Sequence, residues 1–248
     1  MTVDLEGEKY LPGTYAKARS NAADLADNLI SQWDKRRLEM KKEHSRPGLW
    51  PTICFSRKIG VGALEIADIL AEKISYHVVD REIVEHMASE AKLSEKTIDI
   101  FDERYPGEIR EFLAMAFGEK SFISSDYNKD LFSVAYSIAG LNPTIFVGRG
   151  IHLLLPRERV LAVRFLSSRE YRVKRLAGIM GVEEKKAGSE LDQIDKEQRN
   201  FFKKAYGKKD ASPYEFDLVI NCDYISKPEW AAEIVAKAFE KKFGTKAD

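Results

Sequence analysis

The fold of this chain is decided by one stretch, Thr52-Ile53-Cys54-Phe55-Ser56-Arg57-Lys58-Ile59-Gly60-Val61-Gly62-Ala63-Leu64-Glu65-Ile66-Ala67. It begins with a short apolar run, passes through two glycines, and then repeats apolar residues at helical spacing. A strand, a glycine turn and a helix in this order direct backbone N–H groups into the turn, where the helix N-terminus favours an anion. The stretch therefore predicts a phosphate-binding turn over Ser56–Glu65.

The turn departs from the complete phosphate-loop pattern, which reads G-x-x-x-x-G-K-[ST]. Ala63 occupies the position of the phosphate-binding lysine, and Leu64 or Glu65 occupies that of the magnesium-binding hydroxyl. Arg57 and Lys58 add positive charge beside the turn. Two interpretations stay open, a phosphate cradle or a plain strand-to-helix corner. Glu65 is also well placed to cap the helix backbone without any ligand.

Four further apolar runs predict the remaining strands: Tyr76–Val79, Thr144–Val147, Val160–Leu166 and Phe216–Asn221. They are short and apolar throughout instead of alternating, which is typical of strands buried on both faces. Helical patterns separate them, so the sequence predicts an α/β fold, a three-layer α/β/α architecture with a five-stranded parallel sheet. Such sheets bind ligands at the carboxyl ends of their strands. This rule selects Asp80-Arg81 and Gly148-Arg149-Gly150 in addition to the glycine turn.

The chain divides into an N-terminal arm and helix, residues 1–48, and a main domain, residues 49–248. We expect a loose arm up to about residue 20 and a helix over residues 21–44. Inside the main domain, a helical insert spans about residues 81–143. A basic lid spans about residues 181–210, where residues 183–206 predict a helix, a polar turn and more helix. The N-terminal helix either packs on the core or pairs with another copy in a homodimer.

Charged side chains stand at the other predicted strand ends. Asp80 is placed to accept hydrogen bonds from a sugar or base and Arg81 to pair with a phosphate, although Asp80 is an equally good helix N-cap. Arg149 lies between two glycines that permit close approach of a phosphate to its guanidinium. In the basic lid, Arg199 is the best candidate to neutralise phosphate charge, and Lys203 follows it on the same helical face. The alternative for these lid charges is a solvated surface.

Composition and charge limit the classes of function. The chain is 44% hydrophobic and 32% charged, and its 40 basic residues balance 40 acidic ones. This balance gives no case for a nucleic-acid or membrane-surface partner. The start of the sequence lacks a basic and apolar leader, and no run approaches the ~20 apolar residues of a membrane span. We therefore expect a cytoplasmic protein, with two reduced core cysteines and no protein-held metal cluster.

Several motifs occur in a fixed order between about Pro51 and Phe243. They are Ser56-Arg57-x-x-Gly60-x-Gly62-x-x-Glu65, Asp80-Arg81-Glu82-Ile83, Asp102-Glu103-Arg104, Val147-Gly148-Arg149-Gly150, Arg169-Glu170-Tyr171-Arg172-x-x-Arg175 and Asp195-x-x-x-Arg199-x-x-x-x-x-Tyr206. In this order and spacing they resemble the cytidylate kinase-like family. The resemblance implies a P-loop nucleoside triphosphate hydrolase fold with an acceptor-binding insert and a lid. It also implies transfer of the ATP γ-phosphoryl group to CMP or dCMP in the presence of Mg²⁺.

The resemblance assigns roles to individual residues. It implies that the donor phosphates are held by Ser56, Arg57, Lys58, Gly60, Val61, Gly62 and Ala63. It implies that the acceptor nucleotide meets Asp80, Arg81, Arg104 and Arg149. The residues acting on the transferring group would be Arg57, Arg149, Arg175 and Arg199. Arg172, Arg175 and Arg199 would belong to the lid and its hinge. For the segment around Arg104, a surface ion pair is the alternative.

Two departures from cytidylate kinases keep the function open. Ala63 replaces the phosphate-loop lysine, and Gly150 stands where those enzymes carry an aspartate that touches the cytosine or the acceptor. The leading interpretation is a nucleotide kinase for CMP or dCMP. The alternatives are a non-catalytic nucleotide-binding regulatory protein and a kinase for another small acceptor, because a fold does not fix a substrate.

Overall fold

A single parallel sheet forms the centre of the protein. The computed structural model describes residues 3–5, 8–10, 21–40, 49–105, 107, 109 and 126–244. The strands are β3 (Thr52–Arg57), β4 (His77–Asp80), β5 (Thr144–Val147), β6 (Val160–Leu166) and β7 (Leu218–Asn221). Their order across the sheet is β4-β5-β3-β6-β7, and every neighbouring pair is parallel. The five predicted strands and the predicted fold class are confirmed.

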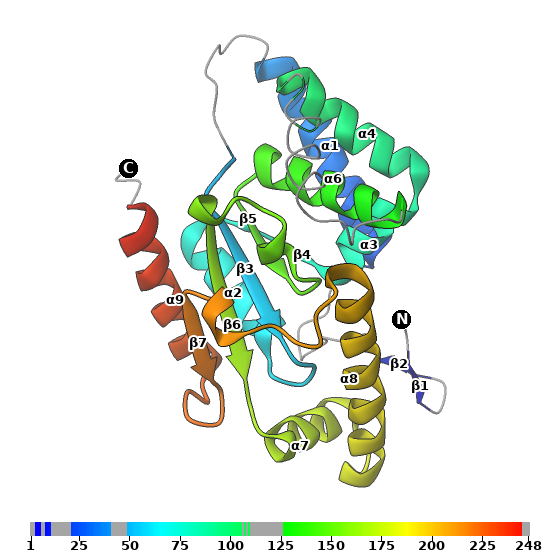
Figure 1. The fold of residues 1–248 in the computed structure, drawn as a ribbon, viewed down its shortest axis with the longest axis vertical. Helices are drawn as coiled ribbons and strands as arrows, with labels where there is room; N and C mark the ends of the chain where they lie inside the picture. The colour runs from blue at the N-terminus through cyan, green and yellow to red at the C-terminus, as the bar shows by residue number, and fades with distance from the viewer. Residues whose placement is uncertain are drawn as a thin grey trace.

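Helices cover both faces of the sheet (Figure 1). On one face α2 (Ala63–Ile74) and α9 (Pro228–Phe243) pack over Ile53 and Phe55 in one apolar cluster. On the other face Cys54 belongs to a second cluster. This cluster also contains residues of α1 (Ala22–Met40), α3 (Arg81–Ser89), α4 (Ala91–Arg104) and α6 (Asp126–Leu141). Successive side chains of β3 therefore enter opposite clusters, as the pleat of a strand requires.

Two more helices, α7 (Arg169–Met180) and α8 (Glu184–Tyr206), lie beyond the carboxyl ends of the strands (Figure 1). The predicted polar turn inside residues 183–206 is wrong, because α8 is one helix of 23 residues. Glu, Lys, Gln and Ala make up about half of α8, and all of them favour helix. Its apolar residues Leu191 and Ile194 share a third cluster with Leu176 of α7 and Ile59 of the glycine turn. The basic lid segment is thus packed onto the turn.

The N-terminal region contains an antiparallel pair, β1 (Val3–Leu5) and β2 (Glu8–Tyr10). The expectation of a loose arm is wrong for these residues, and the remainder of the arm lies outside the described part of the chain. A two-residue connection containing glycine favours a hairpin, which was the missed signal. Helix α1 packs through Ala26, Ile30 and Trp33 into the core of its own chain. Residues 41–44 of the predicted helix lie outside the described residues.

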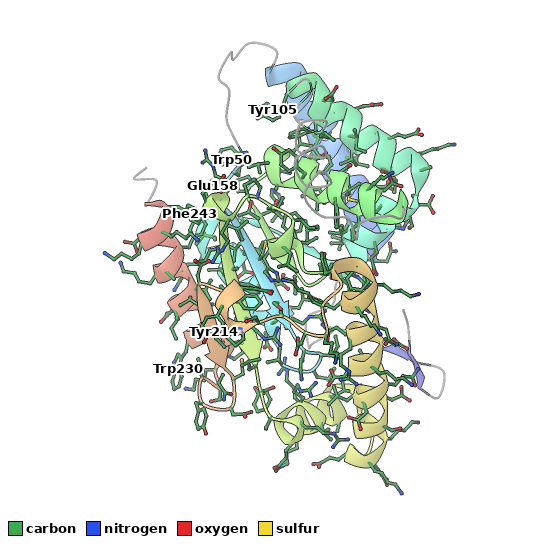
Figure 2. All side chains as sticks on the ribbon, viewed as in Figure 1. Trp50, Tyr105, Glu158, Tyr214, Trp230 and Phe243 are labelled. Atoms are coloured by element: carbon green, nitrogen blue, oxygen red, sulfur yellow. The ribbon has the colours of Figure 1, made fainter. Side chains whose placement is uncertain are left out.

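Both cysteines are free and buried. In the described ranges, no helix is both long and apolar enough to cross a bilayer. Several large apolar side chains are exposed on β7, on α9 and on the segment just before β7. Of these, Tyr214 and Trp230 lie on the side away from α8 (Figure 2). This surface is therefore separate from the glycine turn and the helices that pack on it.

A buried histidine follows β5. The short helix η1 (Ile151–Leu153) places His152 against the Phe216 ring, with 4.6 Å between ring centroids, and its Nε2 lies 3.6 Å from Glu215 Oε2. Glu215 ends the short helix η3 (Pro213–Glu215), and η2 (Arg157–Arg159) precedes β6. Burial lowers the pKa of His152 to about 4, because it opposes the charged imidazolium more than Glu215 favours it. The folded protein therefore holds a neutral imidazole.

Acidification will destabilise the protein through His152. The unfolded chain takes up a proton below its ordinary pKa of 6.5, whereas the folded chain does so only near 4. The stability that comes from the neutral His152 is therefore present above about pH 6.5. It is lost as the pH is lowered, so the free energy of unfolding decreases by about 2 kcal/mol from pH 7.5 to pH 5. Urea unfolding at the two pH values measures this loss. A His152→Gln variant should lack this part of the loss, and an unchanged pH dependence in that variant would contradict the assignment.

Candidate functional site

The turn after β3 has the backbone that an anion cradle needs. Gly60 and Gly62 adopt φ angles of 84° and 85°, the left-handed region that glycine enters without strain. Gly62 is the N-cap residue of α2, so the helix begins at Ala63 with its first N–H groups at the turn. A Cβ on Gly60 would lie 3.1 Å from Cβ of Arg172. The glycines therefore allow both the conformation of the turn and the close approach of α7.

Helix α7 contributes two arginines with different surroundings. Arg175 Nη2 donates to Glu65 Oε2 at 2.6 Å, beside the first turn of α2. Arg172 is buried, forms a bidentate pair with Asp195 of α8 at 3.0 Å, and donates to the carbonyl oxygen of Ile59 at 3.3 Å. The lid and hinge role that the resemblance implies for Arg172 stays a prediction. The structure shows that its side chain forms a buried ion pair linking α7 to α8 and a hydrogen bond to the turn.

Arg57 lies at the junction of two hollows. One is a small cavity lined by the turn residues 57–64 together with Arg175 and Ile179. The other is a cleft between the sheet and α8, lined by Ser56, Arg57, Lys58, Arg164, Asp195, Gln198, Arg199, Phe202, Lys209 and Asp210. Five cationic side chains and two carboxylates line this cleft. The Gln198 side chain donates to the carbonyl oxygen of Arg57 at 2.8 Å, so α8 also holds the turn in place.

Three arginines converge where β3, β4 and β5 end. A Cβ on Gly148 would lie 3.7 Å from Arg81 Cβ and 3.8 Å from Arg57 Nη2. Arg149 adopts a φ of 56° and stacks 3.9 Å above the Phe201 ring, and it forms an ion pair with Glu85. Burial, followed by the charges of Arg81 and Arg57, lowers the pKa of Arg149 to about 9. The side chain remains cationic at neutral pH.

Several N–H donors of this arginine cluster (Arg57, Arg81 and Arg149) are buried and unsatisfied. Within the described part of the chain, Nε and Nη2 of Arg81 and Nε of Arg149 have no hydrogen-bond partner. Arg81 Nη2 lies 3.6 Å from Glu82 Oε1, and burial raises the pKa of Glu82. Buried guanidinium donors without partners are rare in folded proteins. A phosphate group would satisfy them with charge-assisted hydrogen bonds.

The resemblance assigns two further residues to the acceptor nucleotide, Asp80 and Arg104. Asp80 Oδ1 accepts hydrogen bonds from the backbone N–H groups of Glu82 and Ile83, at 2.9 and 3.1 Å. It is thus the N-cap of α3, the alternative that the sequence left open. Arg104 ends α4, and its side chain lies outside what the structure describes. Its neighbour Asp102 accepts a hydrogen bond from the N–H of Gly107 at 3.0 Å.

The turn offers poor ligands for a magnesium ion. The two candidates for the hydroxyl position are Leu64, which is buried among apolar residues, and Glu65, which is engaged by Arg175. Among the described residues there is no group of three or more His, Cys, Asp or Glu side chains that could hold a metal. The residues present do not fit a metal held by protein ligands. Any Mg²⁺ would have to arrive on nucleotide phosphates.

Sequence reasoning missed three side chains of the site. Glu85 and Phe201 hold the guanidinium of Arg149, and Gln198 binds the turn. Glu85 follows Arg81 by four residues and so shares its helical face, which was a usable signal. Phe201 and Gln198 come from α8, which is distant from the turn in sequence, and no local pattern marks them. Of the predicted residues, Arg57, Arg81 and Arg149 come together, while Arg199 lies at the exposed side of the cleft.

The sheet order, the glycine turn after the central strand and the arginines at the strand ends define a P-loop-type kinase fold. The chain belongs to the cytidylate kinase-like family, whose model matches residues 52–224. Membership supports a nucleotide kinase in general and leaves the acceptor open. No curated protein matches the chain significantly.

Two solved structures are similar to this chain. An uncharacterized protein from Eubacterium ventriosum aligns with a TM-score of 0.55 and 18% identity, covering 77% of this chain and 98% of that one. This similarity concerns the fold alone. A shikimate kinase from Bacteroides thetaiotaomicron aligns with a TM-score of 0.38 and 11% identity, covering 77% of this chain and 96% of that one. At that level the likeness carries no argument.

Proposed function

We propose that the protein is a nucleotide kinase that transfers the γ-phosphoryl group of ATP to CMP or dCMP. The observation that carries the proposal is the arginine cluster beside the glycine turn, in which buried N–H donors of Arg81 and Arg149 have no partner within the described part of the chain. Transfer between two phosphorylated ligands needs adjacent anion sites, one for the donor and one for the acceptor. The turn supplies the first, and Arg81 with Arg149 supplies the second.

The chemistry assigned to the chain is positioning and charge neutralisation. An oxygen of the acceptor phosphate attacks the γ-phosphorus of ATP, and the bond from the γ-phosphorus to the oxygen that bridges it to the β-phosphate breaks. ADP leaves, and the acceptor becomes the nucleoside diphosphate. Arg57 borders both hollows and faces the transferring group, while Arg149 orients the acceptor. Arg175 and Arg199 add charge from the helical lid, residues 181–210 and the adjoining α7. Fixed guanidinium groups in a partly enclosed site stabilise the charge on the transferring oxygens.

The acceptor-binding insert, residues 81–143, and the roles of Asp80 and Arg104 are part of the same proposal. Asp80 caps α3 through one oxygen, and the carboxylate can accept a further hydrogen bond. ATP would bring Mg²⁺ with it, and a cytoplasmic location agrees with a reaction that consumes ATP. A homodimer would have to use a surface other than the face of α1 that packs on its own core.

A coupled assay of ADP formation will test the proposed reaction. The full chain is given ATP, Mg²⁺ and, one at a time, CMP, dCMP, UMP, AMP and GMP. We expect turnover with CMP or dCMP, with kcat/KM at least about tenfold above the other monophosphates, a discrimination of about 1.4 kcal/mol. Analysis of products by chromatography should show the matching diphosphate. Absence of turnover with every monophosphate would sink the proposal.

A specific observation favours a different acceptor as the second candidate. A Cβ on Gly150 would lie 2.8 Å from the Tyr206 ring, so the position that carries an aspartate in cytidylate kinases has no room for one. Tyr206 also donates its hydroxyl to the carbonyl oxygen of Arg149. Position 150 therefore provides no side chain that could select cytosine. Turnover with a small phosphorylated or hydroxylated compound, and none with CMP, would support this candidate.

Ala63 favours the third candidate, a protein that binds nucleotides without catalysis. Bound ligand raises the melting temperature by mass action, whether or not any chemistry follows. Thermal stabilisation by ATP or CMP without product in the coupled assay would support it. The absence of stabilisation by every nucleotide would exclude both this candidate and the kinase.

A further inference from the structure

The position of the missing lysine is closed by the structure itself. Ala63 is only 2% exposed and packs in the apolar cluster beneath α2 and α9. Helix α2 therefore brings no cation of its own to the turn at this position. A cation comes instead from α7, because Nε, Cζ and Nη2 of Arg175 lie 3.2, 3.3 and 3.3 Å from a Cβ built on Gly62. These nearly equal distances place the guanidinium flat over the N-cap glycine.

Arg175 is held in this place by a single carboxylate of α2. Its Nη2 donates to Glu65 Oε2 at 2.6 Å, and both side chains remain about a quarter exposed. A pair with that much exposure is weak because water competes for both charges. Glu65 lies in the first turn of α2, where the backbone N–H groups favour a negative charge. The carboxylate thus occupies the environment that an anionic ligand would take.

The cavity at the turn shows what the pair does to that environment. Its volume is about 20 Å³, and Arg175 forms part of its lining. The hollow opens to solvent, so a phosphate bound at the turn would meet the Arg175 guanidinium at its lining. A triphosphate there would compete with Glu65 for that guanidinium.

We infer that Arg175 replaces the absent lysine as the cation that binds the donor triphosphate. In the absence of the triphosphate, Glu65 holds Arg175 over the turn, and the bound triphosphate takes the place of the Glu65 carboxylate. This inference rests on the proposed donor site. Arg175 contacts the ligand, whereas Glu65 is a positioning residue that acts through Arg175. A guanidinium can bind two phosphate oxygens at once, so an arginine that arrives from α7 suits a turn without a lysine.

Isothermal titration calorimetry with inorganic tripolyphosphate tests the inference. This probe has the three phosphates of the donor but no nucleoside, so it reports on phosphate binding at the turn alone. We expect Arg175→Ala to weaken binding at least about tenfold and Arg175→Lys to restore most of it, since one charge-assisted contact is lost and then replaced. Glu65→Gln should tighten binding about threefold, because the ligand no longer competes with a carboxylate. Arg169→Ala is the matched control. Arg169 lies on the same helix and pairs with Asp192 away from the turn.

The outcomes separate this inference from the proposed function. If tripolyphosphate and ATP with Mg²⁺ both fail to bind the unmodified chain, the donor site fails, and the proposed function and this inference fall together. If they bind and Arg175→Ala binds equally well, only the inference is overturned. Arg175→Lys and Glu65→Gln keep the test decisive if Arg175→Ala does not fold. An equal effect of Glu65→Gln in the unmodified chain and in the Arg175→Ala variant would overturn the counter-ion role.

Discussion

Replacing Arg149 by alanine will lower kcat/KM for phosphoryl transfer about 10³-fold, as expected when a guanidinium that neutralises transferring phosphate is removed. The side chain is held ready by two contacts, its ion pair with Glu85 and its stacking on Phe201. Its Nε is buried without a partner among the described residues. The substrate therefore meets a hydrogen-bond donor that is already oriented. Because little side-chain entropy is spent on ordering Arg149 during binding, removing Arg149 raises the activation barrier without a compensating entropy gain.

Variants of Arg149 can separate charge from backbone strain. Alanine keeps the Cβ and therefore the cost of the φ angle of 56°, whereas glycine removes that cost. Arg149→Gly should be as inactive as Arg149→Ala but more stable. Arg149→Lys keeps the charge and loses the fork, so its activity should fall between that of Arg149→Ala and that of the unmodified protein. Arg159→Ala, at an exposed position at the end of η2, is the control.

Steady-state kinetics with ATP and CMP measures all four variants, and circular dichroism confirms that each is folded. Activity of Arg149→Ala within about threefold of the unmodified protein would contradict an acceptor role for Arg149, because a lost charge-assisted contact costs more than that. The same result would leave the fold assignment intact. It would redirect the proposal to Arg57 and Arg199, which line the cleft.

The sheet could be predicted from the sequence because burial leaves a local mark. Strands covered on both faces become continuous apolar runs, and all five runs became strands. The glycines around Arg149 also gave a local signal, and Arg149 indeed has a left-handed backbone. The ion pairs that α7 makes with α8 and with α2 gave none. Arg172 and Asp195 are 23 residues apart, and Arg175 and Glu65 are 110 apart. Only the packing of α7 against α8 and against α2 decides which of these charges meet.

The same packing changes the meaning of the basic lid. Its sequence reads as charged surface with a turn, which suggested a flap. In the structure, Ile59 of the turn is buried between α7 and α8, and Gln198 binds the carbonyl oxygen of Arg57. A side chain that is 1% exposed in an apolar cluster is costly to extract. The helices α7 and α8 therefore support the glycine turn, and movement at the site is easier for single side chains such as Arg175.

Replacing Asp195 by alanine will destabilise the protein by about 3–5 kcal/mol, the cost of leaving a buried charge unpaired. Arg172 is 5% exposed and has both nitrogens of its fork on this carboxylate. For a domain of this size, the loss corresponds to a fall of roughly 10 °C in the melting temperature. Urea unfolding followed by circular dichroism measures it. Asp192→Ala, which removes the exposed partner of Arg169, should cost less than about 1 kcal/mol.

A double variant distinguishes an unpaired charge from lost packing. Arg172→Met with Asp195→Leu removes both charges and fills the space with apolar atoms, so it should recover most of the stability that Asp195→Ala loses. It also removes the hydrogen bond from Arg172 to the carbonyl oxygen of Ile59, which fixes the turn. We therefore expect a stable protein that binds tripolyphosphate more weakly. If Asp195→Ala costs no more than Asp192→Ala, the buried pair does not hold α7 and α8 on the turn, and another contact such as that of Ile59 must do so.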